Sequence, residues 1–161
     1  MARRRSQCMA LLAFLFILWV GDGVEAAMIH DLLRHHGLPA GLLPKTVRSF
    51  SLDESTGRLQ VRLDDPCYGQ WPGSRVFFDR VIAGNLSYGE LSGVMGLSQE
   101  ELFLWFPVRA ITVSDPSSGL LQLDIGLALK QLSFSLFDDP PDCHPGEVTE
   151  EPAGVLLHGS A

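Results

Sequence analysis

The sequence predicts an all-β domain, an antiparallel β-barrel or a flattened β-sandwich, with one short helix at its N-terminal end. Two observations lead to this prediction. Apolar and polar residues alternate in several short segments, as in Arg58–Leu63 and Leu121–Ile125, and this period of two is typical of strands with one buried face. Turn residues separate these segments at short intervals, as in Ser114–Gly119, which favours a sheet built from hairpins.

A short helix is expected at Met28–His36, before the first strand. The residues of its buried face recur at spacings of three and four: Ile29, Leu32, Leu33 and His36. Gly37 can adopt the left-handed conformation that ends a helix, and Pro39 prevents the helix from continuing.

Strands are expected through most of the remaining chain. The segments TVRSFSL and RLQVRL should form a hairpin around a turn at Gly57. The segment SRVFFDRVIAGNLSYGELSGV is expected to form one long strand or two, bent near Gly84 and Gly89, because glycine within a strand often marks a bulge. Further strands are predicted at VRAITV, LLQLDIG and LSFSLF.

The segment Glu101–Val108, ELFLWFPV, departs from the alternation. Apolar side chains would occupy both faces of a strand here, so we expect it to be covered on both sides by the core and by the N-terminal helix or the loop after it. Incomplete packing would leave an apolar pocket, with Leu38, Leu42, Phe103 and Trp105 as its candidate residues. The alternative is an exposed patch that meets lipid.

Residues 1–26 have the features of a secretory signal peptide. Arg3–Arg5 precede an unbroken apolar run of 13 residues from Cys8 to Val20, and Ala26 ends a suitable cleavage site. Because a bilayer-spanning helix needs about 20 apolar residues, cleavage after Ala26 is favoured over an uncleaved anchor. We expect the protein in the secretory pathway, and then in the extracellular space or apoplast, with no stable membrane insertion after cleavage.

Charge argues against nucleic acid as a partner. The formal net charge is −7, and it becomes −8 when residues 1–26 are removed, since they carry three Arg, one Asp and one Glu. The acidic surface would be repelled by the phosphate backbone.

Cys67 and Cys143 are the two cysteines that follow residue 26. An even pair in an exported chain favours one disulfide; the alternative is two buried free thiols. We expect a single β domain over residues 27–143. Residues 144–161 have no apolar period and are acidic at first, which indicates a flexible tail.

The sequence predicts one modification site and no catalytic residue. Asn85 begins an N-x-S sequon and is a glycosylation candidate; the alternative is an ordinary strand asparagine. No cofactor or metal site is expected, because the adjacent His35 and His36 would diverge by about 100 degrees on a helix and no metal-binding spacing is present.

Several stretches together resemble a plant family called domain of unknown function 538: LLRHHGLPAGLLPKTV, TGRLQVRLDDPC, VIAGNLSYGELSGVMGL, QEELFLWFPV and KQLSFSLFDDPPDC. They cover nearly all of residues 28–143. The resemblance implies a compact β-barrel or flattened β-sandwich, likened to the lipid-binding domains of bactericidal/permeability-increasing proteins. It also implies roles in stress responses and in cell-wall or trichome development, and, for some members, hydrolysis of chlorophyll esters.

Three functions are compatible with these features. The first is binding of a small apolar ligand, a lipid or related metabolite, by a monomer. The second is a non-catalytic interaction protein of the cell wall, development or stress. The third is an ester hydrolase, for which no G-x-S-x-G motif is found, so an enzyme is the least favoured of the three.

Overall fold

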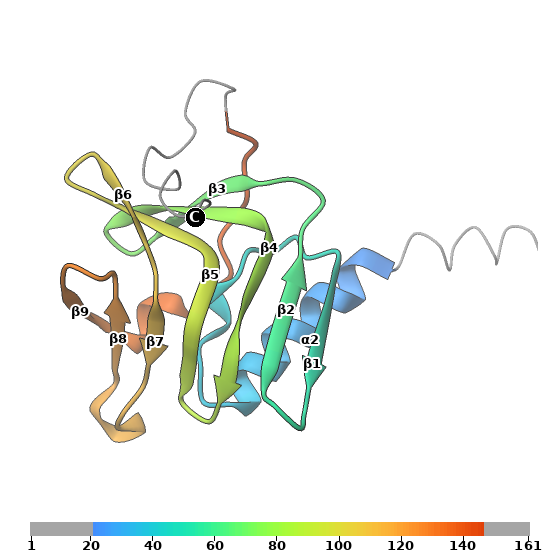
Figure 1. The fold of residues 1–161 in the computed structure, drawn as a ribbon, viewed down its shortest axis with the longest axis horizontal. Coiled ribbons are helices and arrows are strands. Elements are labelled where there is room, and N and C mark those ends of the chain that lie inside the picture. The colour runs from blue at the N-terminus through green and yellow to red at the C-terminus, as the bar shows by residue number, and fades with distance from the viewer. Residues whose placement is uncertain (1–20, 147–161) are drawn as a thin grey trace, which may run out of the picture.

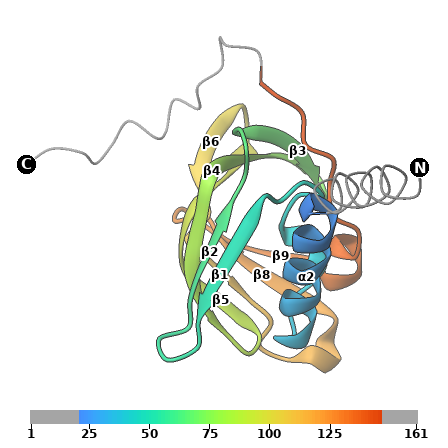
Figure 2. The same ribbon diagram turned by 90° about the vertical axis from the view of Figure 1, so that its right-hand side faces the viewer.

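The computed structural model describes residues 21–146, in which nine antiparallel strands form one strongly bent sheet with a helix against its inner side (Figure 1). The predicted all-β class and the N-terminal helix are confirmed. We call the face toward the helix the inner face and the opposite face the outer face; Figure 2 shows the helix beside the sheet.

The elements follow one another in a simple order. Helix α2 spans Gly21–His35. The strands are β1 (Ser49–Asp53), β2 (Arg58–Arg62), β3 (Cys67–Trp71), β4 (Ser74–Ser87), β5 (Glu90–Glu101), β6 (Leu104–Pro107), β7 (Ala110–Thr112), β8 (Leu120–Asp124) and β9 (Leu129–Ser133). Three short 3-10 turns lie between or after them, η1 (Ala40–Leu42), η2 (Pro116–Ser118) and η3 (Phe134–Phe137).

The two long strands β4 and β5 organise the sheet. The main strand order is β1-β2-β4-β5-β7-β8-β9, with β3 paired to β4 and β6 paired to β5 outside this path. The register between β4 and β5 shifts between Phe78 and Ala83, where extra residues bend and twist a strand pair. In the described part of the chain β1 and β9 remain the two ends of the path, so the sheet is flattened and sandwich-like and does not close into a barrel.

The core lies between the inner face, α2 and the segment around η1. Trp71 donates from Nε1 to the carbonyl oxygen of Gly41 at 3.1 Å. Its ring meets Phe78 and Phe137 edge to face, with centroids 6.2 and 5.6 Å away, a favourable geometry for aromatic pairs. Gly41 permits this packing, because a Cβ there would lie 2.3 Å from the carbonyl oxygen of Phe137.

The helix is longer than predicted. It is already helical at Gly21, the first described residue, and not first near Met28, and Ala26 packs in the core with Ile29 and Leu33. The apolar run Cys8–Val20 lies outside the described residues. Among the helices of residues 21–146, none has the length and apolar character required to cross a membrane.

The prediction of a strand covered on both sides at Glu101–Val108 is wrong. The chain reverses inside this segment, since β5 ends at Glu101, and Glu101 is paired with Leu104 across a two-residue turn. Leu102 and Phe103 form the turn with φ of 51° and 67°. The apolar run therefore spans a hairpin tip and is not one continuous strand.

Candidate functional site

The candidate site is a groove on the outer face of β3, next to a disulfide. Cys67 and Cys143 are bonded as predicted, with their Cα atoms 5.4 Å apart. Beyond the bridge, the amides of Tyr68 and His144 donate to each other's carbonyl oxygens at 2.7 and 2.8 Å. Backbone pairing thus continues past Cys143, the residue at which the domain was expected to end, and holds His144 beside Tyr68 of β3.

The groove has a volume of about 590 Å³ and is formed by β3, the start of β4 and the C-terminal segment. Its lining residues are Tyr68, Gly69, Gln70, Arg75, Pro141, Asp142, His144, Pro145 and Gly146. The Tyr68 ring and two prolines share the lining with charged and amide side chains. Such a mixture suits a ligand that is apolar with a polar end.

A cluster of aromatic rings borders the groove. The ring centroid of Tyr68 lies 5.1 Å from that of Phe77 and 5.5 Å from that of Trp105. The guanidinium carbon of Arg75 lies 5.3 Å from the Tyr68 centroid and 5.5 Å from the Trp105 centroid. These distances are those of cation–π contacts, and we call these four residues the aromatic cluster.

Strand register explains why distant residues meet here. Tyr68 lies directly opposite Phe77 in the β3–β4 pair, and Trp105 lies opposite Glu100 in the β5–β6 pair. Because side chains alternate between faces, the burial of Trp71 on the inner face of β3 places Tyr68 on the outer face. An ion pair of 3.6 Å between Arg75 Nη1 and Glu100 Oε2 links β4 to β5 at this point.

A second ion pair holds the far wall of the groove. Lys45 Nζ lies 2.9 Å from Asp142 Oδ1, although the two residues are 97 positions apart. The hydrogen bond from Lys45, helped by its charge, holds the pKa of Asp142 below its usual value. Asp142 is therefore a carboxylate at neutral pH, and it adds a negative charge to the lining of the groove, which also contains Arg75.

The candidate pocket residues do not come together. Leu38 and Leu42 are buried in the inner core, whereas Trp105 belongs to the outer aromatic cluster and Phe103 lies at the hairpin tip with 93% of its surface exposed. The sheet stands between the two pairs. Only Trp105 of the four is part of the candidate site.

Three residues of the aromatic cluster were missed at the level of sequence: Tyr68, Arg75 and Phe77. The segment that carries Tyr68, CYGQW, was not among the predicted strands; it is short and is followed by Pro72. Its alternation of Cys67, Gly69 and Trp71 against Tyr68 and Gln70 was the available signal.

Asn85 lies on β4 with an exposed side chain. It is paired with Arg58 of β2 and Ser92 of β5, so it is a central-strand residue on the outer face. Its glycosylation stays a prediction.

Two histidine rings in the described chain contact backbone carbonyl oxygens near α2. His30 Nε2 contacts the oxygen of Pro44 at 3.0 Å, and His36 Nδ1 contacts that of Leu32 at 2.9 Å. Burial lowers the pKa of His30. Within residues 21–146 there is no group of three or more His, Cys, Asp or Glu side chains placed to hold a metal ion.

These features define a disulfide-linked β-sheet domain with a filled core and a groove on its outer face. The chain belongs to the family described as protein of unknown function DUF538, whose pattern matches residues 29–138. This confirms the resemblance found in the sequence.

An uncharacterized protein of Arabidopsis thaliana is 26% identical to this chain over an alignment of 98 residues, and the match covers 58% of the chain. The chain spans 57% of the length of that relative. No solved structure matches at a significant level.

Proposed function

We propose that the protein is an exported, non-catalytic binding protein that takes a small apolar or amphipathic ligand, such as a lipid or related metabolite, on the outer face of its sheet. The observation that supports this proposal is the aromatic cluster beside the disulfide-fixed groove. It combines flat apolar surface with a guanidinium, and both are held in place by strand pairing.

The inner side of the sheet offers less to a ligand. Side chains from α2, η1 and the strands fill it, and the large residues Trp71, Phe78 and Phe137 are almost fully buried there. An apolar ligand would have to displace well-packed side chains, which costs several kcal/mol for each large residue. Binding on the outer face needs no such rearrangement.

The chemistry of the groove favours a ligand with an anionic head. Its apolar part would lie against the rings of Tyr68 and Trp105, and a carboxylate or phosphate would approach Arg75 in exchange for Glu100. The 3.6 Å separation of Arg75 and Glu100 is longer than the 2.7–2.9 Å typical of charge-assisted hydrogen bonds. An anion at hydrogen-bond distance from Arg75 would therefore make a shorter contact than Glu100 makes.

Export is supported by two features. The disulfide Cys67–Cys143 is of the kind that persists in oxidising compartments, and residues 1–26 have the pattern of a cleaved signal. We propose the secretory pathway and then the extracellular space or apoplast of a plant as the location, with the Arabidopsis relative as support for the source. Mass spectrometry of the protein released from plant cells tests both, with Ala27 as the expected first residue.

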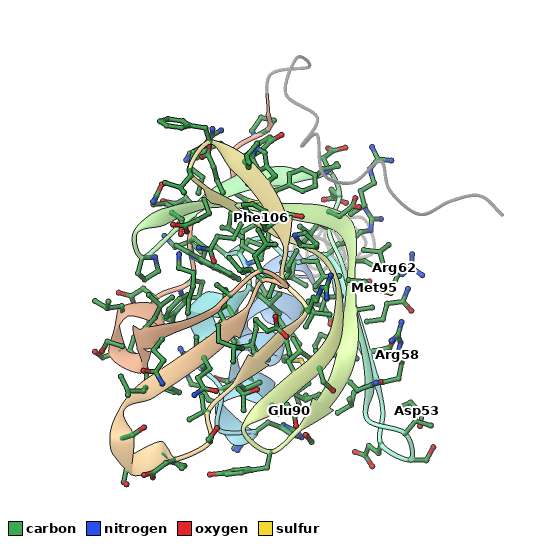
Figure 3. All side chains as sticks on the ribbon, turned by 60° about the vertical axis from the view of Figure 1, so that its left-hand side comes forward. Asp53, Arg58, Arg62, Glu90, Met95 and Phe106 are labelled. Carbon is green, nitrogen blue, oxygen red and sulfur yellow. A yellow bond between two sulfur atoms is a disulfide. The ribbon has the colours of Figure 1, made fainter. Side chains whose placement is uncertain are left out.

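A fluorescent fatty acid, cis-parinaric acid, tests the binding proposal when used below its aggregation concentration. Energy transfer from tryptophan should report saturable binding, and Arg75→Gln should weaken it by about tenfold, since a charge-assisted hydrogen bond contributes about 1.5–3 kcal/mol. Arg62→Gln is the matched control, because Arg62 is exposed on the outer face of β2 and points away from the body (Figure 3). Equal binding by both variants would contradict the proposed site.

A further inference from the structure

Two hairpin tips at one edge of the sheet expose large apolar side chains. The tip between β5 and β6 presents Leu102, Phe103 and Leu104, and the tip between β8 and β9 presents Leu127 and Leu129; all five are more than half exposed. We call these five residues the apolar edge. Figure 1 shows both tips on the left of the molecule, and an ion pair between Lys130 of β9 and Glu101 of β5 joins them.

The fold itself does not require these residues at the first tip. Leu102 and Phe103 both have positive φ, which is the backbone of a type I′ hairpin turn, and Asn-Gly is the usual pair there. Leu and Phe are poorly suited to this backbone, and at 82% and 93% exposure they contribute little to the core. Their side chains therefore point to a role in contact with a partner.

Charges around the apolar edge are balanced, in contrast to the acidic chain as a whole. Glu100 is paired with Arg75, and Glu101 with Lys130. The two acidic residues next to the first tip are thus paired, so they do not repel the phosphate groups of a membrane without net charge.

The side chains are also graded with distance from the tip. Leu102 and Phe103 are at the end, and Trp105 and Tyr68 follow on the outer face with Arg75 over their rings. Trp and Tyr are the residues that prefer the boundary between lipid and water, and Arg75, which lies level with Trp105 in the strand registers, can meet phosphate. Apolar side chains at the tip, with aromatic and cationic side chains next to them, match the acyl chains and the headgroup region of a lipid leaflet.

We infer that the apolar edge docks on a zwitterionic lipid bilayer, with the two tips in the interfacial region. This inference rests on the proposed function in one respect, namely that the ligand of the groove would be drawn from the membrane. A second copy of the chain is a poorer fit, because the tips protrude and the groove beside Tyr68 carries the charged side chains of Arg75 and Asp142.

Sedimentation with phosphatidylcholine vesicles tests the inference. The protein is purified from the medium of a secreting eukaryotic host, so that every variant carries the same N-terminus. Leu102→Asn with Phe103→Gly replaces the tip by the pair that the turn prefers, so the fold is retained. We expect the vesicle partition coefficient to fall at least about tenfold, since each large apolar side chain returned to water costs at least this factor.

Met95→Ser is the matched control. Met95 is 61% exposed, close to the 60% of Leu104, and lies on the outer face of β5 away from the tips (Figure 3). Its replacement should leave partition unchanged. Equal partition of the tip variant and the wild type would overturn the inference, as would binding only to anionic vesicles.

Size-exclusion chromatography of the same proteins distinguishes self-association from docking on a bilayer. A wild-type dimer that the tip variant converts to a monomer, without vesicle binding, would overturn the bilayer assignment and identify the apolar edge as a contact between copies. A failure of the groove proposal would be observed separately, because Arg75→Gln should reduce parinaric acid binding and the tip variant should not.

Discussion

The inner face of the sheet and the β5–β6 hairpin tip both carry large apolar side chains, but those of the inner face are buried and those of the tip are exposed. On the inner face, Phe78 and Leu97 are almost fully buried against α2 and η1, whereas Leu102 and Phe103 a few residues further on are almost fully exposed. The difference comes from where the chain reverses, because the turn at Leu102–Phe103 carries its side chains past the end of the sheet. Apolar content alone therefore does not distinguish a core from a contact surface.

The largest effect is expected on removal of the disulfide. Cys67→Ser with Cys143→Ser should lower the free energy of unfolding by about 4–5 kcal/mol in the chain-entropy treatment, because the bridge joins residues 76 positions apart. Denaturant titration measures the loss. Hydrogen exchange at the Tyr68 and His144 amides should rise more than exchange in β8, and uniform protection would contradict the view that the bridge holds the groove.

Two phenylalanine replacements, one on the inner face and one at the hairpin tip, test whether the two regions differ in packing. Phe78→Ala should cost about 3 kcal/mol or more, since the deletion leaves a cavity against Trp71. Phe103→Ala should change stability by less than about 0.5 kcal/mol, as is usual for surface positions. Thermal unfolding of both variants gives the difference, and similar losses would show that the hairpin tip is packed.

The turn variant should stabilise the fold by a smaller amount. Leu102→Asn with Phe103→Gly removes two non-glycine residues from the left-handed region, each of which costs on the order of 1 kcal/mol. We expect a gain of about 1–2 kcal/mol in the free energy of unfolding, measured by urea titration. A loss of stability would mean that Leu102 and Phe103 make contacts that support the hairpin.

Much of the fold could be predicted from the sequence, because its signals are local. The alternation in Arg58–Leu63 and Leu121–Ile125 identified β2 and β8, and the even number of cysteines after residue 26 indicated the bridge that the structure contains. The bend of β4 was also expected near Gly84, and the register with β5 shifts between Phe78 and Ala83 and again between Ala83 and Asn85, across that glycine.

The candidate site could not be predicted in the same way. Trp105 was singled out, but its partners Tyr68 and Arg75 depend on the registers of β3 with β4 and of β5 with β6, which no local pattern specifies. The hairpin at Leu102–Phe103 was missed because its turn has neither Asn nor Gly, the usual signals. An uninterrupted apolar run is ambiguous between a buried strand and an exposed tip.

The smallest expected effect concerns pH. Burial lowers the pKa of His30 below its ordinary value of 6.5, so the unfolded chain binds the proton more readily than the folded one. Stability from this residue is complete above about pH 6.5 and is lost as pH falls toward the folded pKa. His30→Gln, which can still donate to the Pro44 oxygen, should flatten that part of the stability profile, and an unchanged profile would contradict the assignment.

Whether the hairpin tip is exposed in water and enters a lipid bilayer is tested most directly by the fluorescence emission of a tryptophan placed there. In Phe103→Trp, the added tryptophan should emit as a water-exposed group in buffer and shift to the blue when phosphatidylcholine vesicles are added, while the tryptophan added in Met95→Trp should not shift. The wild-type spectrum, subtracted under each condition, removes the contribution of the native tryptophans. If the tryptophan introduced at the tip still emits at the wavelength of a water-exposed tryptophan when vesicles are in excess, docking of the apolar edge on a bilayer is contradicted.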